Sequence, residues 1–416
     1  MSYAWLMVAI TFLTHFLAMG FVFYSAGVFL LPLQEEFDVG RTEIALIGSI
    51  MSIGGAVVAP FIGRWVATGS IRFAMTLGCL CLGVAFLAGS RATELWHLFV
   101  VFGPFATLGM STMGGVTTQA LVVNWFEEDR AMALGISMVG ISASGFVIPP
   151  IATALTQAEG WRYAYEMFGL ASLAITPIVF FTVVSRPEER EARKANAEEP
   201  VFRPAPDGAE FSTRDALRER NLWTIAIASG LSFMVTGAIM LHIAAAGIGA
   251  GLSENRAAFL ISAAAVGAAT AKIAFGWLAG KIGELRAVQI AFAAQGLGVL
   301  ALNFTTGFEP FIAAAAVAGL GLGGVAPLAA ALLARAFGQA AFGPMMGLMT
   351  PIMIPFQASG APIAGGIYDT TNRYELAWYA GTVVMLCAIV VVSLLRLPGD
   401  EPLAAVGAEA QPAESS

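Results

Sequence analysis

The sequence predicts an all-α integral membrane protein whose twelve transmembrane helices form two pseudo-repeats of six. Three observations lead to this fold class: the composition, the number of long apolar runs, and an internal repeat. Of the 416 residues, 58% are hydrophobic and only 12% are charged, and the mean hydropathy is +0.78. Soluble domains carry about 25% charged residues. An apolar run of about 18 residues or more is long enough to cross a bilayer.

The apolar runs fall into two groups of six. The first group is 5–31, 43–67, 72–89, 95–124, 131–155 and 163–184. The second group is 222–248, 257–280, 286–304, 309–334, 342–366 and 374–396. These runs predict four parts of the chain: an N-terminal six-helix bundle at 1–184, a cytoplasmic linker loop at 185–221, a C-terminal six-helix bundle at 222–398, and a disordered cytoplasmic tail at 399–416.

The basic residues of the loops predict the orientation. The loops on the side of both termini carry fifteen Lys and Arg, eight of them in 185–221. The other side carries five, which are Arg41, Arg91, Arg162, Arg256 and Arg373. Because Lys and Arg are enriched in cytoplasmic loops, both termini are expected in the cytoplasm of a multi-pass inner (plasma) membrane protein.

Several function classes find no support in the sequence. The first apolar run is too long for a cleavable signal and has no basic flank. Cys79, Cys81 and Cys387 all fall within apolar runs, so they are interpreted as packing residues, and neither a disulfide framework nor a metal site is expected. No catalytic triad pattern or nucleotide-binding loop stands out, so the chain is not expected to be an enzyme or to carry a cofactor.

The two groups of runs echo each other at an offset near 210 residues. The pair Gly114-Gly115 in run 4 matches Gly323-Gly324 in run 10, and Ala143-Ser144-Gly145 in run 5 matches Ala358-Ser359-Gly360 in run 11. Weaker matches follow runs 2 and 8 and end runs 4 and 10. Parallel halves of six spans, with a binding site between them near the bilayer midplane, are typical of transporters.

Several blocks carry a resemblance to a known family. They are YSAGVFLLPL at 24–33 followed by EEF, WF at 125–126, RAMALG at 130–135, GWR at 160–162, and KIAFGWLA at 272–279. On these blocks the chain resembles a major facilitator superfamily transporter over essentially its whole length. Within that superfamily it resembles the bacterial monocarboxylate-transporter-like group, near the oxalate/formate antiporters. The resemblance implies a central cavity lined by spans 1, 4, 7 and 10 and a cation at the Lys272 position that meets a substrate carboxylate.

The chain also departs from the family pattern. The usual Asp after spans 2 and 8 is absent, since Ala67-Thr68 and Gly280-Lys281 stand there. Animal monocarboxylate carriers have an acidic residue one turn before the span-8 cation, and Ala268 occupies that position here. Run 11 has no basic residue in its core, whereas the resemblance implies a second cation there in dicarboxylate exchangers.

Lys272 is the most informative residue of the chain. It lies nine residues before Lys281, about 13 Å along a helix, which places it near the centre of a hydrocarbon layer about 30 Å thick. An intramembrane cation is costly and usually marks a substrate or ion pathway. No acidic residue lies within eleven positions on either side, so the simplest partner is an anionic substrate. The alternative is a structural Lys paired with backbone carbonyls or with a polar group of another span.

Five other residues are candidates for substrate binding. His15 and His242 could hydrogen-bond a carboxylate or take a proton, although a lone His in an apolar helix is often a hydrogen-bonded core residue. Tyr24 could contact substrate or anchor at the interface. Gln119 and Gln357 could line a cavity or join helices.

The sequence therefore predicts alternating-access transport of a small organic monocarboxylate, by proton symport or by anion exchange. The expected partners are the organic anion, possible coupling protons and the lipid bilayer, with no nucleic acid, and a monomer is expected. Two alternatives remain open: efflux of an amphipathic or neutral compound, and a transport-inactive membrane sensor of ligand.

Overall fold

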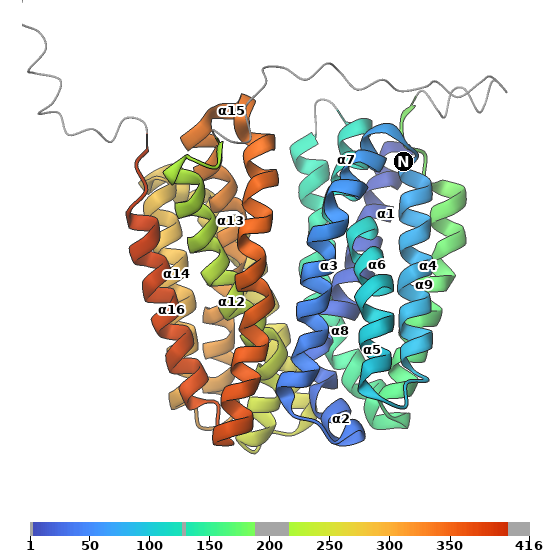
Figure 1. Cartoon of the computed structure of the whole chain (residues 1–416), viewed down its shortest axis with the longest axis vertical. Coiled ribbons are helices and arrows are strands. Elements are labelled where there is room, and N and C mark those ends of the chain that lie inside the picture. The colour runs from blue at the N-terminus through green and yellow to red at the C-terminus, as the bar shows by residue number, and fades with distance from the viewer. Residues whose placement is uncertain (1–2, 127–129, 188–215, 398–416) are drawn as a thin grey trace, which may run out of the picture.

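The computed structural model describes residues 3–126, 130–187 and 216–397, and the regular elements in these ranges are all helices. Figure 1 shows two groups of helices side by side, running along a common direction. The tail at 399–416 and most of the linker loop lie outside the described residues.

The first group is formed by the N-terminal half of the chain. Its elements are α1 (Tyr3–Ala18), the π-helical segment η1 (Met19–Tyr24), α2 (Ala26–Phe37), α3 (Arg41–Thr68), α4 (Ile71–Gly89), α5 (Leu95–Val101), the π-helical segment η2 (Phe102–Ala106), α6 (Thr107–Met113), α7 (Gly115–Trp125), α8 (Arg130–Glu159) and α9 (Trp161–Thr182). Two of the predicted spans are interrupted. Run 1 passes through η1 and a bend at Ser25, and run 4 passes through η2 and an extended residue at Gly114.

The second group is formed by the C-terminal half. Its elements are α12 (Arg220–Gly249), α13 (Glu254–Ile282), α14 (Glu284–Ala301), the short 3-10 helix η3 (Leu302–Phe304), α15 (Phe308–Thr371) and α16 (Glu375–Ser393). With 64 residues, α15 would be about 96 Å long if straight, far more than a bilayer. Figure 1 shows that α15 doubles back, so it supplies both run 10 and run 11.

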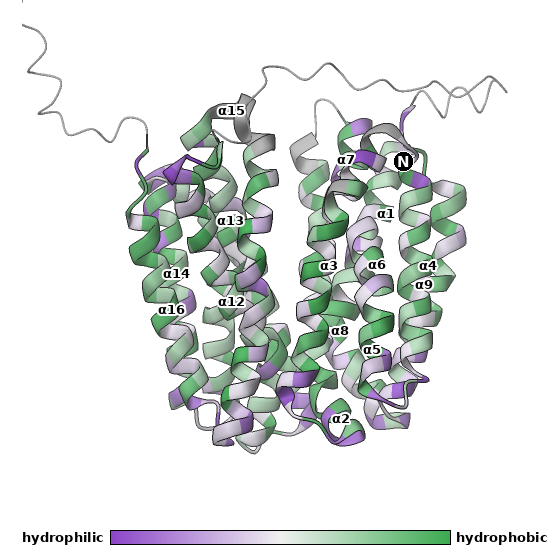
Figure 2. Cartoon of the chain, viewed as in Figure 1, coloured by the Kyte–Doolittle hydropathy of each residue, from purple (hydrophilic) through white to green (hydrophobic). Residues whose placement is uncertain are grey.

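The hydropathy of the helices fits a membrane protein. In the described part of the chain, eleven helices are long and apolar enough to cross a membrane, and the twelfth predicted run, 342–366, is the returning limb of α15. Figure 2 shows hydrophobic residues along the bodies of both groups and hydrophilic residues gathered at the two ends. The two ends are therefore the water-facing parts of the molecule.

The two ends differ in what they hold. At one end, Tyr3 donates its hydroxyl to the Thr182 carbonyl at 2.5 Å, and Asn221 binds the Arg396 carbonyl at 2.7 Å. This end holds the start and finish of both halves (Figure 1) and is called the linker end below. The other, called the closed end, holds α2 and the first residues of α3.

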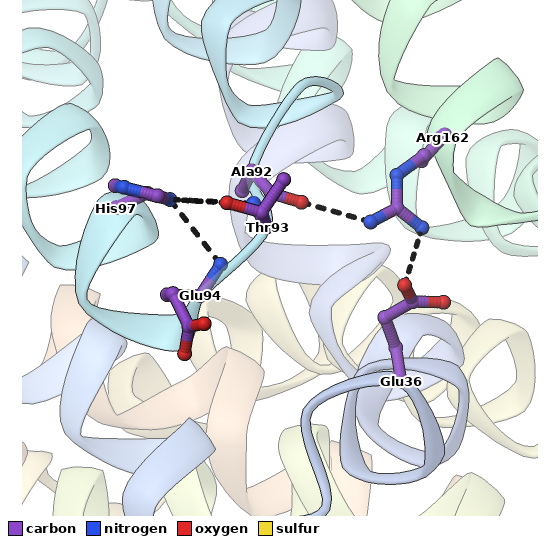
Figure 3. A network of polar contacts seen from close by, with 6 residues as sticks. All are labelled: Glu36, Ala92, Thr93, Glu94, His97 and Arg162. Atoms are coloured by element: carbon purple, nitrogen blue, oxygen red, sulfur yellow. Dashed lines mark hydrogen bonds and ion pairs between the residues drawn. The ribbon is translucent and has the colours of Figure 1, made fainter.

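An ion pair ties three elements of the first half together at the closed end. Arg162 of α9 binds Glu36 of α2 at 2.8 Å and donates to the Ala92 carbonyl at 2.8 Å, in the loop after α4 (Figure 3). At the start of α5, His97 Nδ1 accepts the backbone N–H of Glu94 of the same loop at 3.2 Å. Among the described residues, this network forms no hydrogen bond or ion pair with the second half.

Glycines allow close packing inside the second half. A Cβ added at Gly323 would lie 1.9 Å from the Ala268 carbonyl oxygen, and one at Gly319 would lie 2.1 Å from the Ala264 carbonyl oxygen. Only a residue without a side chain permits α13 and α15 to approach this closely. The glycine pattern thus fixes the packing that holds Lys272 in place on α13.

Candidate functional site

A cavity of about 430 Å³ lies between the two halves. The first half contributes residues of η1, α2, α3, α4, η2, α6 and α9 to its walls, and the second half contributes residues of α12 and of the returning limb of α15. Phe21, Phe29, Phe86, Phe102 and Met240 make much of the wall apolar. The volume suits a small organic molecule, because ligand pockets are typically about 300–1,000 Å³.

The polar groups on the cavity wall are neutral. They include the hydroxyls of Ser49, Ser52, Thr107 and Tyr165 and the side-chain amide of Gln357. None of the residues that line the cavity carries a formal charge. Spans 1, 4 and 7 contribute to the wall as the resemblance implies, while span 10 contributes none of the lining residues.

Lys272 lies at the boundary between the halves and is not among the residues that line the cavity. Its ammonium donates a hydrogen bond of 3.0 Å to the hydroxyl of Ser142, which is on α8 of the first half. Lys272 is partly exposed, and it forms no ion pair with any carboxylate in the described part of the chain. In the described part of the chain, no acidic side chain therefore neutralises the charge of Lys272.

Within the described ranges, three hydrogen bonds join α8 of the first half to α13 of the second. Between α8 and α13 there are hydrogen bonds from Gln157 to Glu254 at 2.8 Å and from Ser262 to the Phe146 carbonyl at 3.2 Å. Among the described residues, the Lys272–Ser142 bond is the hydrogen bond between these two helices that lies nearest the linker end. Figure 1 shows the two groups of helices close together at the closed end and set apart toward the linker end.

His15 and Tyr24 approach the same stretch of α8. The His15 ring is buried, with Nδ1 3.3 Å from the Ser137 hydroxyl and Nε2 2.9 Å from the Thr118 hydroxyl. Tyr24 is 4% exposed and packs its ring so close to Gly145 that an added Cβ there would lie 2.7 Å from it. Three of the six candidates therefore converge on residues 137–145 of α8.

The other three candidates lie elsewhere. Gln357 lines the cavity on the returning limb of α15. Gln119 is exposed on α7 and does not line the cavity. His242 is fully buried, with Nδ1 2.9 Å from the Tyr374 hydroxyl and Nε2 2.9 Å from the Ala361 carbonyl oxygen. Its ring is thus a hydrogen-bonded core residue beside the cavity wall.

Sequence reasoning did not find the polar cluster that Tyr374 belongs to. Arg41, counted only as an outside basic residue, is 7% exposed and donates to the Tyr374 hydroxyl and to Gln34 Oε1 at 3.1 Å. Asp369 accepts the backbone N–H groups of Arg41 and Thr42, both at 3.0 Å. The cluster joins α3 of the first half to α15 and α16 of the second.

Comparisons with known proteins agree with this architecture. The chain matches the family model of the Major Facilitator Superfamily over residues 11–253 and 222–415. Human "Monocarboxylate transporter 11" is 26% identical over 417 residues, covering 96% of this chain and 85% of the human protein. Mouse "Monocarboxylate transporter 12" is 24% identical over 421 residues, covering 95% of this chain and 86% of the mouse protein.

A solved structure is also similar over its whole length. It is a bacterial homologue of the human lysosomal transporter Spinster in an inward-facing, unoccupied conformation, with a TM-score of 0.71, 15% identity and 95% coverage of both chains. At this identity the likeness shows the fold alone. With the family match, it confirms the fold class and the superfamily resemblance predicted from the sequence.

Proposed function

The chain belongs to the major facilitator superfamily and is a membrane transporter rather than an enzyme, and on that premise we propose that it carries a small organic monocarboxylate by alternating access. Lys272 is the charge partner of the substrate carboxylate. The observation that carries the proposal is the environment of its ammonium, whose hydrogen-bond partner is one neutral hydroxyl, Ser142. A charge inside the membrane is costly without a partner, and an anionic substrate supplies the counter-charge.

The cavity supports a substrate with one carboxylate and an apolar body. Its wall offers aromatic rings and hydroxyls but no charged side chain, so a second anionic group would have no cation to meet there. Relatives that span nearly the whole chain are named monocarboxylate transporters. Hydroxyls such as Ser52 and the amide of Gln357 can orient the polar end of such a molecule.

Binding of an anion at Lys272 couples to movement of the two halves relative to each other. The Lys272–Ser142 bond crosses from one half to the other and is, among the described residues, the hydrogen bond between α8 and α13 nearest the linker end. A carboxylate on the ammonium replaces the hydroxyl as its strongest partner, because charge-assisted hydrogen bonds are about twice as strong as neutral ones. Substrate binding thereby weakens a contact between the halves.

Two coupling modes fit this site, proton symport and anion exchange. In symport the proton is held by His15 or His242 or travels on the substrate. We place both termini in the cytoplasm of the inner (plasma) membrane, on the basic residues of the linker-end loops, and we propose a monomer as the transporting unit.

Ligand-induced stabilisation tests the assignment of Lys272. Purified protein is heated with a panel of monocarboxylates, dicarboxylates and neutral analogues, and the panel is repeated on Lys272→Gln. A ligand at 100 times its dissociation constant adds about 2.7 kcal/mol of stability. Lys281→Gln is the matched control, because Lys281 lies on the same helix but is exposed, with its ammonium 4.0 Å from the Trp277 ring.

We expect one class of monocarboxylates to stabilise the wild type and Lys281→Gln but not Lys272→Gln. Stabilisation that survives in Lys272→Gln contradicts the site. Stabilisation by neutral compounds alone points to efflux of an amphipathic or neutral substrate. Uptake into proteoliposomes then separates a carrier from a sensor, because a sensor binds the acid without moving it.

A further inference from the structure

The first turn of α3 is capped by a side chain from the other half. The N–H groups at the start of a helix have no partner within it. Here the Asp369 carboxylate accepts the backbone N–H of Arg41 at 3.0 Å and that of Thr42 at 3.0 Å, and it also accepts the Thr42 hydroxyl at 2.6 Å. A carboxylate at a helix N-terminus is favourable because it meets the positive end of the helix dipole. A helix end of one half is therefore stabilised by an anion of the other.

The Arg41 side chain makes a second connection across the same boundary. Its guanidinium carbon lies 3.5 Å from the centre of the Tyr368 ring and 5.2 Å from that of Tyr374. It also donates to the Tyr374 hydroxyl. Arg stacks on aromatic faces while its N–H groups remain free to donate. A cation of the first half is thus held between two tyrosines of the second.

The hydrogen bonds continue in one direction toward the cavity. The Tyr374 hydroxyl accepts from Arg41, so its own proton points to His242 Nδ1, 2.9 Å away. His242 Nε2 must then donate to the Ala361 carbonyl, because a carbonyl can only accept. The neutral His242 with its proton on Nε2 satisfies every bond, and Ala361 lines the cavity.

Close backbone packing seals the same region. A Cβ added at Gly365 of α15 would lie 2.8 Å from the Thr42 nitrogen of α3. Further along, the Ser49 hydroxyl binds the Ala358 carbonyl, and both residues line the cavity. Molecules therefore cannot leave the cavity between these helices toward the closed end while the contacts persist.

We infer that Arg41, Asp369 and Tyr374 form a latch that shuts the closed end and breaks each time the cavity opens there. Alternating access requires the halves to separate at each end in turn. Separation at the closed end removes the cap from α3, the aromatic stack from Arg41 and the bond to Tyr374 together. The latch goes beyond the proposed function, because it acts in the same way whatever substrate the cavity holds.

Access of a thiol reagent to the cavity tests the latch. Ser52 lines the cavity and is replaced by Cys as a reporter, and labelling of the native cysteines is subtracted using the protein without the reporter. A membrane-impermeant maleimide is applied to sealed vesicles that present the closed end, identified by labelling of Thr306→Cys, an exposed residue in the loop before α15. Coupling free energies between conformations commonly correspond to 5- to 150-fold changes in population.

Asp369→Ala is expected to raise the labelling rate of the reporter about tenfold. Glu36→Ala is the matched control, since it removes one carboxylate of an ion-paired network at the same end without touching the other half (Figure 3). It should label at the rate of the protein that carries the reporter alone. An unchanged rate in a folded Asp369→Ala protein overturns the latch, as does an equal rise in Glu36→Ala.

A gentler variant covers a failure of Asp369→Ala to fold. Tyr374→Phe removes only the hydroxyl that links Arg41 to His242 and should raise labelling about threefold, and an unchanged rate in this variant overturns the latch. Labelling is measured without substrate. The latch can therefore fail while the monocarboxylate assignment holds, and the reverse is equally observable.

Discussion

Arg41 and Lys272 both place a positive charge at the boundary between the halves, but their surroundings differ. Arg41 is 7% exposed, stacks on Tyr368, and donates to Gln34 and Tyr374. Its own backbone N–H is capped by Asp369. Lys272 is less buried and has a single neutral partner, the Ser142 hydroxyl. The chain thus supplies the partners of one cation and leaves the other nearly unpaired.

This difference separates a structural charge from a functional one. A charge with several partners in the chain stabilises the conformation in which these groups meet. A change to another conformation would leave buried polar groups without partners. A charge with one weak partner contributes little stability and remains available to a ligand. We therefore assign Arg41 to the closed state of one end and propose Lys272 as the charge that meets the substrate.

The strongest test of this comparison is the stability of Arg41→Gln. Removing the guanidinium leaves the Tyr374 hydroxyl without its donor and Tyr368 without its stacked cation, so unfolding should become easier by about 3 kcal/mol. Unfolding in detergent measures this loss. Arg373→Gln is the control, because Arg373 is exposed at the same end and only loosely paired with Glu375 at 3.9 Å. An equally large loss of unfolding free energy in Arg373→Gln would show that positive charge at this end stabilises the protein, whether or not it belongs to the latch.

Lys272→Met should have the opposite effect on stability. An unpaired intramembrane Lys costs about 2.5–3.5 kcal/mol on insertion scales, and its ammonium here recovers only one hydrogen bond. The apolar variant should therefore unfold with a free energy equal to wild type or up to about 2 kcal/mol higher, while losing its response to carboxylates. A clear loss of stability would mean that Lys272 is a structural residue like Arg41.

The sequence distinguished only one of these two cations. Lys272 stands out because it interrupts a long apolar run, and the hydropathy of the runs together with the paired glycines was enough to predict the fold. Arg41 and Asp369 lie at helix ends, where charges are ordinary, and their contacts join residues more than 320 positions apart. Nothing local to Arg41 indicates that it is buried.

The histidines show the same limit. Their position in apolar runs marks both histidines as candidate site residues, but the sequence does not indicate their hydrogen-bond partners. Thr118 and Ser137 reach His15, and Tyr374 reaches His242, through packing between helices that are distant in sequence. The π-helical segment η1, which ends at Tyr24, contains no proline in its sequence MGFVFY, so no proline announces it in the sequence.

Ser142→Ala gives a smaller effect that sharpens the comparison. It removes the sole hydrogen-bond partner of the Lys272 ammonium found in the structure, and such a bond to a charged group contributes about 1.5 kcal/mol. Ser144→Ala is the control, because that hydroxyl binds the Ile141 carbonyl of its own helix at 2.8 Å. With a saturating monocarboxylate the deficit of Ser142→Ala should shrink, since the carboxylate becomes the partner. A deficit that ligand leaves unchanged would argue against carboxylate binding at Lys272.

The smallest expected effect is the response of the latch to mild acid. Partial burial acts to raise the pKa of Asp369, but hydrogen bonds from Thr42 and the backbone of Arg41, with the charge of Arg41, hold it below its usual range. The latched state therefore binds fewer protons than the open one. Its stabilisation is complete above the ordinary pKa of about 4 and is lost only as the pH falls through the lowered value.

The difference in unfolding free energy between the wild type and Asp369→Asn should thus stay constant from pH 8 to pH 6. It should become smaller only near pH 4 and below. Unfolding at a series of pH values measures it. The charged and titratable groups around this carboxylate are Arg41, Glu43, whose carboxylate also lies against Gly40, the tyrosines Tyr368 and Tyr374 and, through Tyr374, His242. Of these residue types, only histidine ordinarily changes its charge between pH 8 and pH 6. A difference that already narrows between pH 8 and pH 6 would therefore assign control of the latch to His242, and would make protonation of that ring the step that opens the closed end.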